Sequence, residues 1–393
     1  MTRLELGSRT DGGPDVYEFR TRDGLHAADA FREAELLALE RVWEDTPGEL
    51  LVVQANYGVL GAVLAAGAET VTMTESSARA AETCRENVRG NGVDATVRTV
   101  ARESELDQTF DTAVYVPKPY TALDVGKQRI ADAVDRLDPG GRLYLAARER
   151  TGLNRYRDCL SAMDAQSERV ASADSVEVLR ATRPATFDPP TYVERQTATV
   201  RIPEGHAGEV GATGAVEAEA IDLHLVSEPG LFAAGRLDDG TRLLMQTVDV
   251  ADDERVLDLC CGCGPLGTYA ALTAECSVTL TDDDARATAC AKETLAKNGA
   301  LEKTGVDGDV ITADGVDGVR DRSFDLVLSN PPTHAGTGVL SDLFDGVGAV
   351  LAPGGRFAFV HHRELDLSPH LGAFGTVEHV ETGPEHEIRV ARR

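Results

Sequence analysis

The chain contains two copies of one sequence pattern. Residues 69–92 read ETVTMTESSARAAETCRENVRGNG, and residues 276–299 read CSVTLTDDDARATACAKETLAKNG. Farther along, LDPGGRLYL from Leu137 aligns with LAPGGRFAF from Leu351. The copies are 207 residues apart in the first stretch and 214 apart in the second, which indicates a loop insertion of seven residues. A repeat of this length is a duplicated domain, since solenoid units are only about 20–50 residues long.

Each copy alternates apolar, strand-like runs with segments of helical spacing. In the second copy the expected helices begin at Pro265, Ala285 and Val339, and the expected strands are Arg255–Cys260, Ser277–Thr281, Asp309–Thr312, Asp325–Ser329 and Arg356–Val360. Strands that alternate with helices favour a parallel, doubly wound sheet, which binds ligands at the carboxyl ends of its strands. The sequence therefore predicts an α/β fold of two tandem Rossmann-like domains, each with a doubly wound, mostly parallel sheet.

A stretch rich in Pro, Gly, Ala and Glu separates the copies. It runs from Pro184 to about Gly214 and includes PATFDPP and IPEGHAGEVGATG, which are dense in residues that interrupt helices and strands. We therefore expect a first domain over residues 1–190, a linker over 191–214 and a second domain over 215–393.

The composition is acidic and poor in lysine. The 66 Asp and Glu residues outnumber 39 Lys and Arg, the net charge is −27, and only five of the basic residues are Lys. Such charge keeps proteins soluble in concentrated salt and predicts a halophilic, haloarchaeon-like host, although taken alone it argues against nucleic acid as a partner. No run of about 18 apolar residues and no signal peptide is present, so we expect a cytoplasmic protein with no membrane contact.

A glycine-rich turn in the second copy predicts a nucleotide-type cofactor. VLDLCCGCGPLG, from Val256, is a buried strand that enters a turn containing Gly262 and Gly264 and then a helix. Glycines let backbone N–H groups approach a ligand at a helix N-terminus. Asp258 stands in the approach to this turn, where it would repel a pyrophosphate and attract a cationic amino-acid head group. The pattern therefore favours S-adenosylmethionine over NAD.

Two further carboxylates follow the next two strands. Asp282 stands where it can accept hydrogen bonds from ribose hydroxyls, with Asp283 and Asp284 as neighbouring alternatives. Asp284 would equally serve as a helix N-cap. Asp314 follows the third strand, beside the place of an adenine amino group, although an Asp before a Gly is also typical of a plain turn.

The sharpest chemical signal is the sequence Ser329-Asn330-Pro331-Pro332-Thr333-His334, directly after a strand. Proline lacks an N–H, so we expect loop carbonyls that face a ligand without competing donors. The Asn330 side-chain oxygen and the Pro331 carbonyl would both accept from one exocyclic NH₂ and aim its lone pair at a methyl sulfonium. Asn330, Pro331 and Pro332 are therefore the predicted catalytic residues, and Asn330 also borders the cofactor.

With these motifs the sequence resembles class I S-adenosylmethionine-dependent methyltransferases, and within them the small-subunit rRNA guanine-N2 methyltransferases with tandem domains. PGLF from Pro229 and LDDGT from Leu237 resemble that family's extension ahead of the cofactor loop. The resemblance implies two tandem methyltransferase domains of which only the second is active, S-adenosylmethionine as cofactor, and small-subunit rRNA or an assembling subunit as partner. The family's loop reads Asn-Pro-Pro-Phe-His-x-Gly, and here Thr333 replaces the aromatic residue. Phe232 is the expected substitute as a stacking platform, and Thr333 and His334 are expected near the substrate.

The first copy lacks the chemistry of the second. Val52 stands in place of Asp258, Asn56 in place of Gly262, and Val116 in place of Asn330, giving Val116-Pro117-Lys118-Pro119. We therefore expect a first domain without a working cofactor site, which supports the fold and helps to hold RNA through Lys118.

Other functions share some of these features. An adenine N6 or a protein glutamine amide also presents an NH₂ to an Asn-Pro-Pro loop, and a non-catalytic RNA-binding assembly factor would retain a pocket without turnover. No metal is expected, because Cys260, Cys261 and Cys263 lack a second cysteine pair and a structural zinc site requires four ligands.

Overall fold

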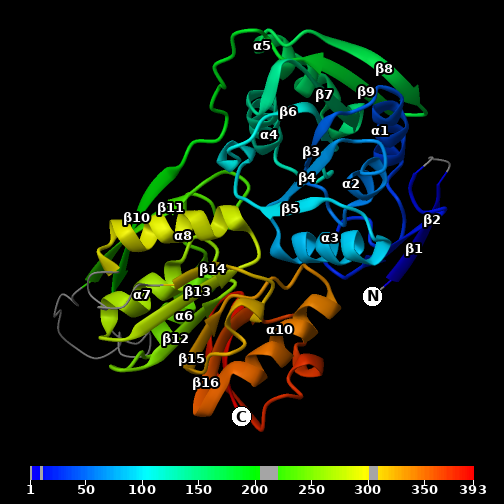
Figure 1. The fold of residues 1–393 in the computed structure, drawn as a ribbon. Helices are drawn as coiled ribbons and strands as arrows, with labels where there is room; N and C mark the ends of the chain where they lie inside the picture. Colours follow the sequence, from blue (N-terminus) through cyan, green and yellow to red (C-terminus); the bar gives the residue numbers. More distant parts are fainter. Residues whose placement is uncertain (1, 9–11, 204–219, 301–308) are drawn as a thin grey trace. The chain divides into compact units, whose positions relative to one another are not determined.

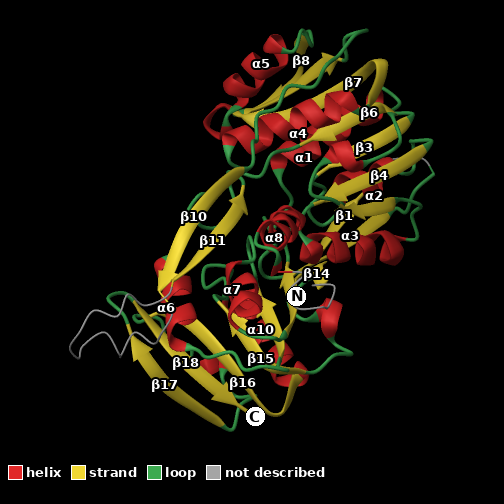
Figure 2. Cartoon of the chain, turned by 90° about the vertical axis from the view of Figure 1, so that its left-hand side faces the viewer, coloured by secondary structure: helices red, strands yellow, loops and turns green. Residues whose placement is uncertain are grey.

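The computed structural model describes residues 2–8, 12–203, 220–300 and 309–393. The chain divides into two compact units, Met1–Glu194 and Arg195–Arg393 (Figure 1). Each unit is a seven-stranded sheet covered by helices and preceded by a two-stranded antiparallel hairpin (Figure 2).

The first unit begins with the hairpin β1 (Thr2–Gly7) and β2 (Val16–Thr21). Its sheet has the strand order β5-β4-β3-β6-β7-β9-β8, in which β5, β4, β3, β6 and β7 are parallel and β9 is antiparallel to both of its neighbours, β7 and β8. The bounds of the remaining elements are α1 (Glu33–Glu44), β3 (Glu49–Val53), α2 (Val59–Leu64), β4 (Thr70–Glu75), α3 (Ala78–Asn91), β5 (Thr96–Thr99), η1 (Glu103–Glu105), β6 (Phe110–Tyr115), α4 (Leu123–Asp135), β7 (Leu137–Arg148), η2 (Glu149–Thr151), α5 (Leu153–Ala162), β8 (Ser167–Ala173) and β9 (Val176–Thr182).

The second unit repeats this plan with the strand order β14-β13-β12-β15-β16-β18-β17. Its hairpin is β10 (Gln196–Pro203) and β11 (Ala220–Ser227). The bounds of the other elements are α6 (Asp239–Thr247), β12 (Arg255–Leu259), α7 (Pro265–Thr273), β13 (Ser277–Asp282), α8 (Ala285–Lys297), β14 (Asp309–Thr312), η3 (Asp317–Val319), β15 (Phe324–Ser329), α10 (Thr337–Val350), β16 (Leu351–His362), η4 (Ser368–His370), β17 (Thr376–Thr382) and β18 (His386–Arg392). The expected α/β class and doubly wound, mostly parallel sheets are confirmed.

The two units share backbone detail as well as topology. The glycine-type turn after the first sheet strand has three left-handed residues in both copies, namely Gln54, Asn56 and Gly58 in one and Cys260, Gly262 and Gly264 in the other. The register shift in β6–β7, between Phe110 and Thr112, also recurs in β15–β16, between Phe324 and Leu326. The two copies therefore share the backbone conformation at the carboxyl ends of their parallel strands, even where their side chains differ.

Burial explains why these segments form strands and helices. The central strand β12 pairs with parallel neighbours on both sides, and its residues from Val256 to Leu259 are buried, so a continuous apolar run suits it. Separate apolar clusters pack on the two faces of this sheet. Helix α8 begins where Asp284 accepts a hydrogen bond from the Arg286 N–H, and it buries one face that includes Cys290.

The segment between the copies differs from the linker that we expected over residues 191–214. The first compact unit ends at Glu194, and β10 pairs residue by residue with β11, as β1 pairs with β2 in the first unit. Part of the expected linker is therefore the first strand of the second unit. Residues 204–214 lie outside the described residues. Among the helices that are described, none is long and apolar enough to cross a membrane.

Candidate active site

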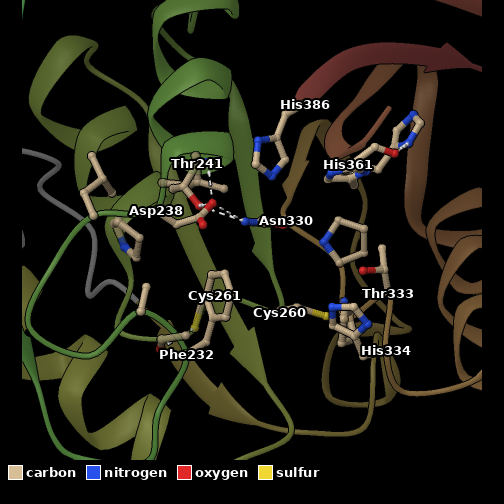
Figure 3. A pocket seen from close by; sticks show the side chains of 18 of the residues that line it. Phe232, Asp238, Thr241, Cys260, Cys261, Asn330, Thr333, His334, His361 and His386 are labelled. Atoms are coloured by element: carbon tan, nitrogen blue, oxygen red, sulfur yellow. Dashed lines mark hydrogen bonds between the residues drawn. The ribbon is translucent and has the colours of Figure 1, made fainter. Parts of the chain in front are cut away.

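A pocket of about 760 Å³ opens in the second unit where β12, β13, β15 and β16 end (Figure 3). Of the predicted site residues, those that line it are Phe232, Gly262, Asp282, Asn330, Pro331, Pro332, Thr333 and His334. Asp258, Gly264 and Asp314 are not in the lining, and Lys118 belongs to the first unit. The pocket volume lies within the range of about 300–1,000 Å³ that is usual for small-molecule sites.

The glycine turn is held by hydrogen bonds that its backbone N–H groups donate. The Cys261 N–H donates to the Thr281 carbonyl at 3.0 Å, and the Gly262 N–H donates to Asp282 Oδ2 at 2.8 Å. A Cβ on Gly262 would meet no atom within 4 Å, so this residue presents bare backbone to open space. Gly264 has a φ of +79°, and a Cβ there would approach Leu280 Cδ2 to 2.9 Å, so a side chain would disrupt the turn.

Asp258 supports the turn from behind. It is 1% exposed, and its Oδ2 accepts a hydrogen bond from the Gly267 N–H at 2.8 Å. Its Oδ1 is buried and has no hydrogen-bond partner among the described residues. Burial raises the pKa of the Asp258 carboxyl to about 7, against the effect of the Gly267 N–H.

The structure distinguishes the three acids at the end of β13. Asp282 lines the pocket and accepts from the N–H groups of Gly262 and Asp284, whereas Asp284 caps helix α8. Burial raises the pKa of Asp282 to about 7 despite these two hydrogen bonds. The neighbouring strand end lies close, because the Ala313 N–H donates to the Asp282 carbonyl at 2.9 Å, which brings the turn that contains Asp314 beside the site.

The Asn330 side chain is held in one orientation. Its Nδ2 donates to Asp238 Oδ2 at 3.1 Å and to Thr241 Oγ1 at 3.0 Å (Figure 3). A carboxylate only accepts hydrogen bonds, so the amide nitrogen must face Asp238 and the amide oxygen must face away from it. Asp238 is itself fixed, because it caps helix α6 by accepting from the Thr241 N–H at 3.0 Å.

The proline loop differs in one respect from our expectation. The Pro331 carbonyl accepts a hydrogen bond from the Thr333 N–H at 2.8 Å, so it has a competing donor within the loop. A second lone pair remains, since a carbonyl oxygen has two. The Pro332 carbonyl likewise accepts from the Ala335 N–H at 2.9 Å.

Aromatic and imidazole groups also line the pocket. Phe232 is 64% exposed at the rim, and Figure 3 shows its ring projecting from the loop that precedes α6. His361 and His386 come from the ends of β16 and β18. Asp238 and Thr241 were missing from the predicted site, although the LDDGT motif that contains them was recognised as a family feature.

The three clustered cysteines are packing groups in this structure. Burial raises the pKa of Cys260 and Cys261 well above the ordinary thiol range and that of Cys263 to about 12, so all three are neutral thiols. Within the described residues, no group of three or more His, Cys, Asp or Glu side chains is arranged to hold a metal ion.

The corresponding edge of the first unit is occupied by its own side chains. Lys118 Nζ pairs with Glu75 Oε1 at 3.0 Å, and the Glu75 side chain is fully buried. Glu75 also accepts from the Asn56 N–H at 2.5 Å, as Asp282 accepts from the Gly262 N–H in the second unit. Lys118 therefore forms an ion pair with a buried carboxylate. The sequence had suggested a contact with RNA for this residue.

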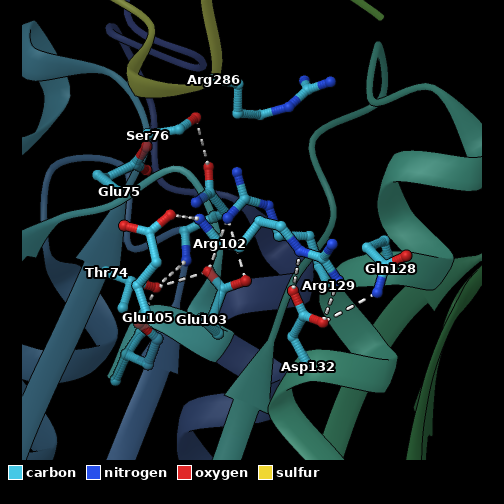
Figure 4. A network of polar contacts seen from close by, with 12 residues as sticks. Thr74, Glu75, Ser76, Arg102, Glu103, Glu105, Gln128, Arg129, Asp132 and Arg286 are labelled. Atoms are coloured by element: carbon cyan, nitrogen blue, oxygen red, sulfur yellow. Dashed lines mark hydrogen bonds and ion pairs between the residues drawn. The ribbon is translucent and has the colours of Figure 1, made fainter. Parts of the chain in front are cut away.

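A network of buried polar groups continues along this edge (Figure 4). Arg129 Nη1 contacts both oxygens of Glu103 at 2.9 and 3.0 Å, and Thr74 Oγ1 donates to Glu103 Oε1 at 3.0 Å. Arg102 forms a two-point contact with Asp132 at 2.7 and 2.9 Å. These pairs join the end of β4 and the segment after β5 to the C-terminal half of α4.

Comparison with known proteins identifies similar chains. The family model for the methyltransferase small domain matches residues 16–180 and again residues 222–389. A ribosomal RNA small subunit methyltransferase C of Pseudomonas paraeruginosa is 31% identical over 292 residues, which cover 71% of this chain and 78% of the relative. A ribosomal RNA large subunit methyltransferase G of Streptomyces avermitilis is 29% identical over 363 residues, which cover 88% of this chain and 87% of that one.

The fold is also found among solved structures. A T. thermophilus 16S rRNA N2 methyltransferase, solved in complex with AdoMet and guanosine, has a TM-score of 0.73 at 20% identity. The match covers 100% of this chain and 98% of the other. At this level of identity the likeness establishes the tandem fold.

Proposed function

The chain belongs to the methyltransferase small domain family, and on this premise we propose that it methylates the exocyclic N2 of a guanine in small-subunit rRNA. The observation that carries the proposal is the fixed orientation of the Asn330 amide at the rim of the pocket. The methyl donor is S-adenosylmethionine, which supplies an electrophilic methyl group on a sulfonium.

The residues present suit that cofactor. Bare backbone at Gly262 and the half-buried carboxylate of Asp282 form one wall of the pocket, and Asp282 would accept the ribose hydroxyls. The unpartnered Oδ1 of Asp258 leaves acceptor capacity beneath the same turn. We propose Asp258, Gly264 and Asp314 as supporting cofactor residues, the first two because they shape the turn and the third because its turn is tied to Asp282.

Asn330 acts by positioning an amine. With its nitrogen engaged by Asp238 and Thr241, its Oδ1 is available to accept an N–H from the target NH₂. The Pro331 carbonyl would accept the second N–H through its remaining lone pair. These acceptors aim the nitrogen lone pair at the methyl carbon, so that the N–C bond forms as the S–C bond breaks and the nitrogen then releases a proton to water.

We propose that the first unit has no cofactor function. Arg32 occupies the position of Asp238 and donates to the carbonyls of Val116 and Pro117 at 3.1 and 2.7 Å. No amide or carboxylate acceptor remains at Val116, and Lys118 neutralises Glu75, the counterpart of Asp282. A site with these substitutions lacks both the amine acceptor and a carboxylate free for ribose.

Asn330→Ala tests the proposed chemistry. We expect methyl transfer to rRNA to fall about 100-fold or more, because a preorganised polar contact to the reacting group is lost, while calorimetry shows nearly unchanged cofactor affinity. Mass spectrometry of nucleosides from rRNA should show N2-methylguanosine with the native enzyme. Detection of N6-methyladenosine, or of a methylated protein glutamine instead, would contradict the proposal.

The choice of ribosomal subunit is tested in the same experiment. The similarity to a large subunit methyltransferase G over 88% of this chain makes large-subunit rRNA the second candidate. Nucleosides from the two rRNAs, prepared separately from a strain that lacks the gene, should show the lost methyl group in the small-subunit fraction.

We further propose a cytoplasmic enzyme from a salt-rich, haloarchaeon-like host, on the basis of the net charge of −27.

A further inference from the structure

The first unit contains a pocket of about 410 Å³, beside the strand ends that its own side chains fill. Three arginines and one glutamate contribute its charged lining, namely Arg32, Arg148, Arg150 and Glu33. Basic residues therefore outnumber acidic ones in this lining, whereas the whole chain has 66 acidic and 39 basic residues. The pocket is therefore a local cationic site on an anionic protein.

The arginines differ in how far they are neutralised. Arg32 pairs with the buried Glu35 at 3.1 Å, and Arg148 pairs with Glu33. Arg150 is exposed and forms no ion pair among the described residues. Burial, with added repulsion from Arg32 and Lys118, lowers the pKa of His26 in the pocket wall to about 4, so this imidazole is neutral at pH 7.

An exposed aromatic ring stands at the rim. The Tyr120 side chain is 69% exposed, although tyrosines elsewhere in this unit, such as Tyr57 and Tyr115, are buried. Its ring meets that of His26 edge to face at a centroid distance of 5.7 Å, and its chain neighbour Pro119 lines the pocket. One face of the ring is therefore available to a planar group.

The duplication relates this pocket to the substrate side of the active site. Arg148 ends β7 as His362 ends β16, and Arg150 stands where Glu364 stands in the second unit. The counterparts His362 and Glu364 both line the pocket that contains Asn330. In the first unit, side chains fill the region that corresponds to the proposed cofactor site. The region that corresponds to the substrate side remains a pocket, with arginines in place of His and Glu.

We propose that this pocket of the first unit binds one nucleotide of a single-stranded RNA segment, with the phosphate held by Arg148 and Arg150 and the base stacked on Tyr120. Arginine forks match phosphate oxygens, and stacking on an aromatic ring accepts any base. The inference rests on the proposed function, because it assumes an RNA substrate. It assigns a role in holding RNA to Arg148, Arg150 and Tyr120, whereas Lys118 pairs with Glu75.

The test uses the full chain with Arg150→Glu and Tyr120→Ala, and with Arg98→Glu as a control of equal charge change. Arg98 is exposed on β5, an edge strand of the same sheet that β4, β3 and β6 separate from β7. Dissociation constants for a labelled single-stranded RNA are measured by fluorescence anisotropy at one fixed KCl concentration. We expect about a tenfold rise for each pocket variant and less than about twofold for Arg98→Glu, because a stacked base and a phosphate contact are lost only at the pocket.

Activity separates this inference from the proposed function. The pocket variants should keep the native kcat at saturating RNA and the native cofactor affinity, while their KM for RNA rises. Equal weakening by Arg150→Glu and Arg98→Glu, or no weakening by either pocket variant, overturns the pocket. RNA binding that depends on the pocket without methylation of guanine overturns the proposed function alone. Weakened binding to assembled subunits with unchanged binding to naked RNA would assign the pocket to a ribosomal protein and overturn the RNA assignment.

Discussion

Asn330 and Asp238 are 92 residues apart in the chain and joined by a 3.1 Å hydrogen bond from amide Nδ2 to carboxylate Oδ2. The contact decides which end of the amide faces Asp238. It also ties the loop that contains Asn330 to the N-terminus of α6, because Asp238 caps that helix. In the proposed mechanism, Asp238 is therefore a positioning residue, which would act on the target amine only through Asn330.

Asp238→Asn tests this positioning with little damage to the helix, since Asn is as good an N-cap as Asp. The variant replaces a charged acceptor by an amide that can present either end, so the Asn330 amide loses its fixed orientation. A hydrogen bond to a charged group is worth about 1.5–3 kcal/mol, which predicts about a ten- to hundredfold loss of kcat. Steady-state kinetics on rRNA would measure it.

Asp239→Asn is the matched control, because Asp239 is an exposed acid in the first turn of the same helix. It should leave kcat unchanged. The KM for RNA and the thermal midpoint should be native in both variants. Equal kcat for Asp238→Asn and the native enzyme would show that Asn330 is oriented by other contacts.

The pKa of Asp282 gives cofactor affinity a pH dependence. Burial raises this pKa from its ordinary value of 3.8 to about 7. A carboxylate accepts ribose hydroxyls best when ionised, so cofactor affinity should rise about tenfold between pH 6 and pH 8. Calorimetry across this range would measure it, and Asp282→Asn should bind more weakly with a flatter profile.

Stability without cofactor should change in the opposite direction. A folded pKa above the unfolded value means that the folded state binds the extra proton, so this contribution to the free energy of unfolding is full below about pH 4 and lost as pH rises through about 7. Burial also raises the pKa of Asp258 to about 7, so Asp258 makes a contribution to the free energy of unfolding with the same pH dependence.

A cofactor affinity that falls from pH 6 to pH 8 would contradict the role given to Asp282.

The Lys118–Glu75 pair should hold the first unit together. Glu75 is fully buried, and removal of one partner from a buried ion pair costs about 3–5 kcal/mol. Lys118→Met should therefore lower the denaturant midpoint of this unit, whereas Lys118→Met with Glu75→Gln should restore most of it. The chain's single tryptophan, Trp43, lies in α1 of the first unit, so its fluorescence reports this transition.

Cofactor affinity should be native in both of these variants, because the residues proposed to bind the cofactor all belong to the second unit. Native stability of Lys118→Met would show that Glu75 is solvated or protonated. In that case Lys118 would again be a candidate for an RNA contact.

Repetition and local pattern were sufficient to predict the architecture. The duplicated motifs, the apolar runs and the glycine turn are local properties of the chain, and they predicted the class of fold, the order of strands and helices in the second copy, and the loop with Asn330 at the end of β15. β10 was missed because its pairing with β11 depends on residues on the far side of a segment rich in Gly and Ala.

Side-chain partners were harder to predict, because they depend on distances across the fold. The LDDGT motif did not reveal that Asp238 would reach Asn330, and the pattern Val116-Pro117-Lys118-Pro119 did not reveal that Lys118 would reach Glu75. Asp258 was expected to meet the cofactor directly, whereas it accepts from the Gly267 N–H and stands outside the pocket lining. In each case the sequence indicated that the residue was important, but it did not predict which group the side chain would contact.

Phe232 is the proposed substitute for the aromatic residue missing at Thr333. Its ring is 64% exposed at the pocket rim, and stacking on a base is worth about 1–3 kcal/mol. Phe232→Ala should raise the KM for RNA about tenfold or more, Phe232→Tyr should be near native, and adding Thr333→Phe to Phe232→Ala should restore part of the loss. A changed cofactor affinity with an unchanged KM for RNA would place Phe232 on the cofactor side instead.

The net charge of −27 predicts an unusual response to salt. Repulsion among like charges acts over about 30 Å at 0.01 M salt and about 3 Å at 1 M, so the free energy of unfolding should rise from dilute buffer to molar KCl. Salt also weakens phosphate contacts, so the KM for RNA should rise over the same range while kcat is retained. Unfolding midpoints and steady-state kinetics at matched KCl concentrations would measure both effects. An enzyme that is most stable and most active in dilute buffer would contradict the halophilic host, and the acidity would then count against an RNA substrate.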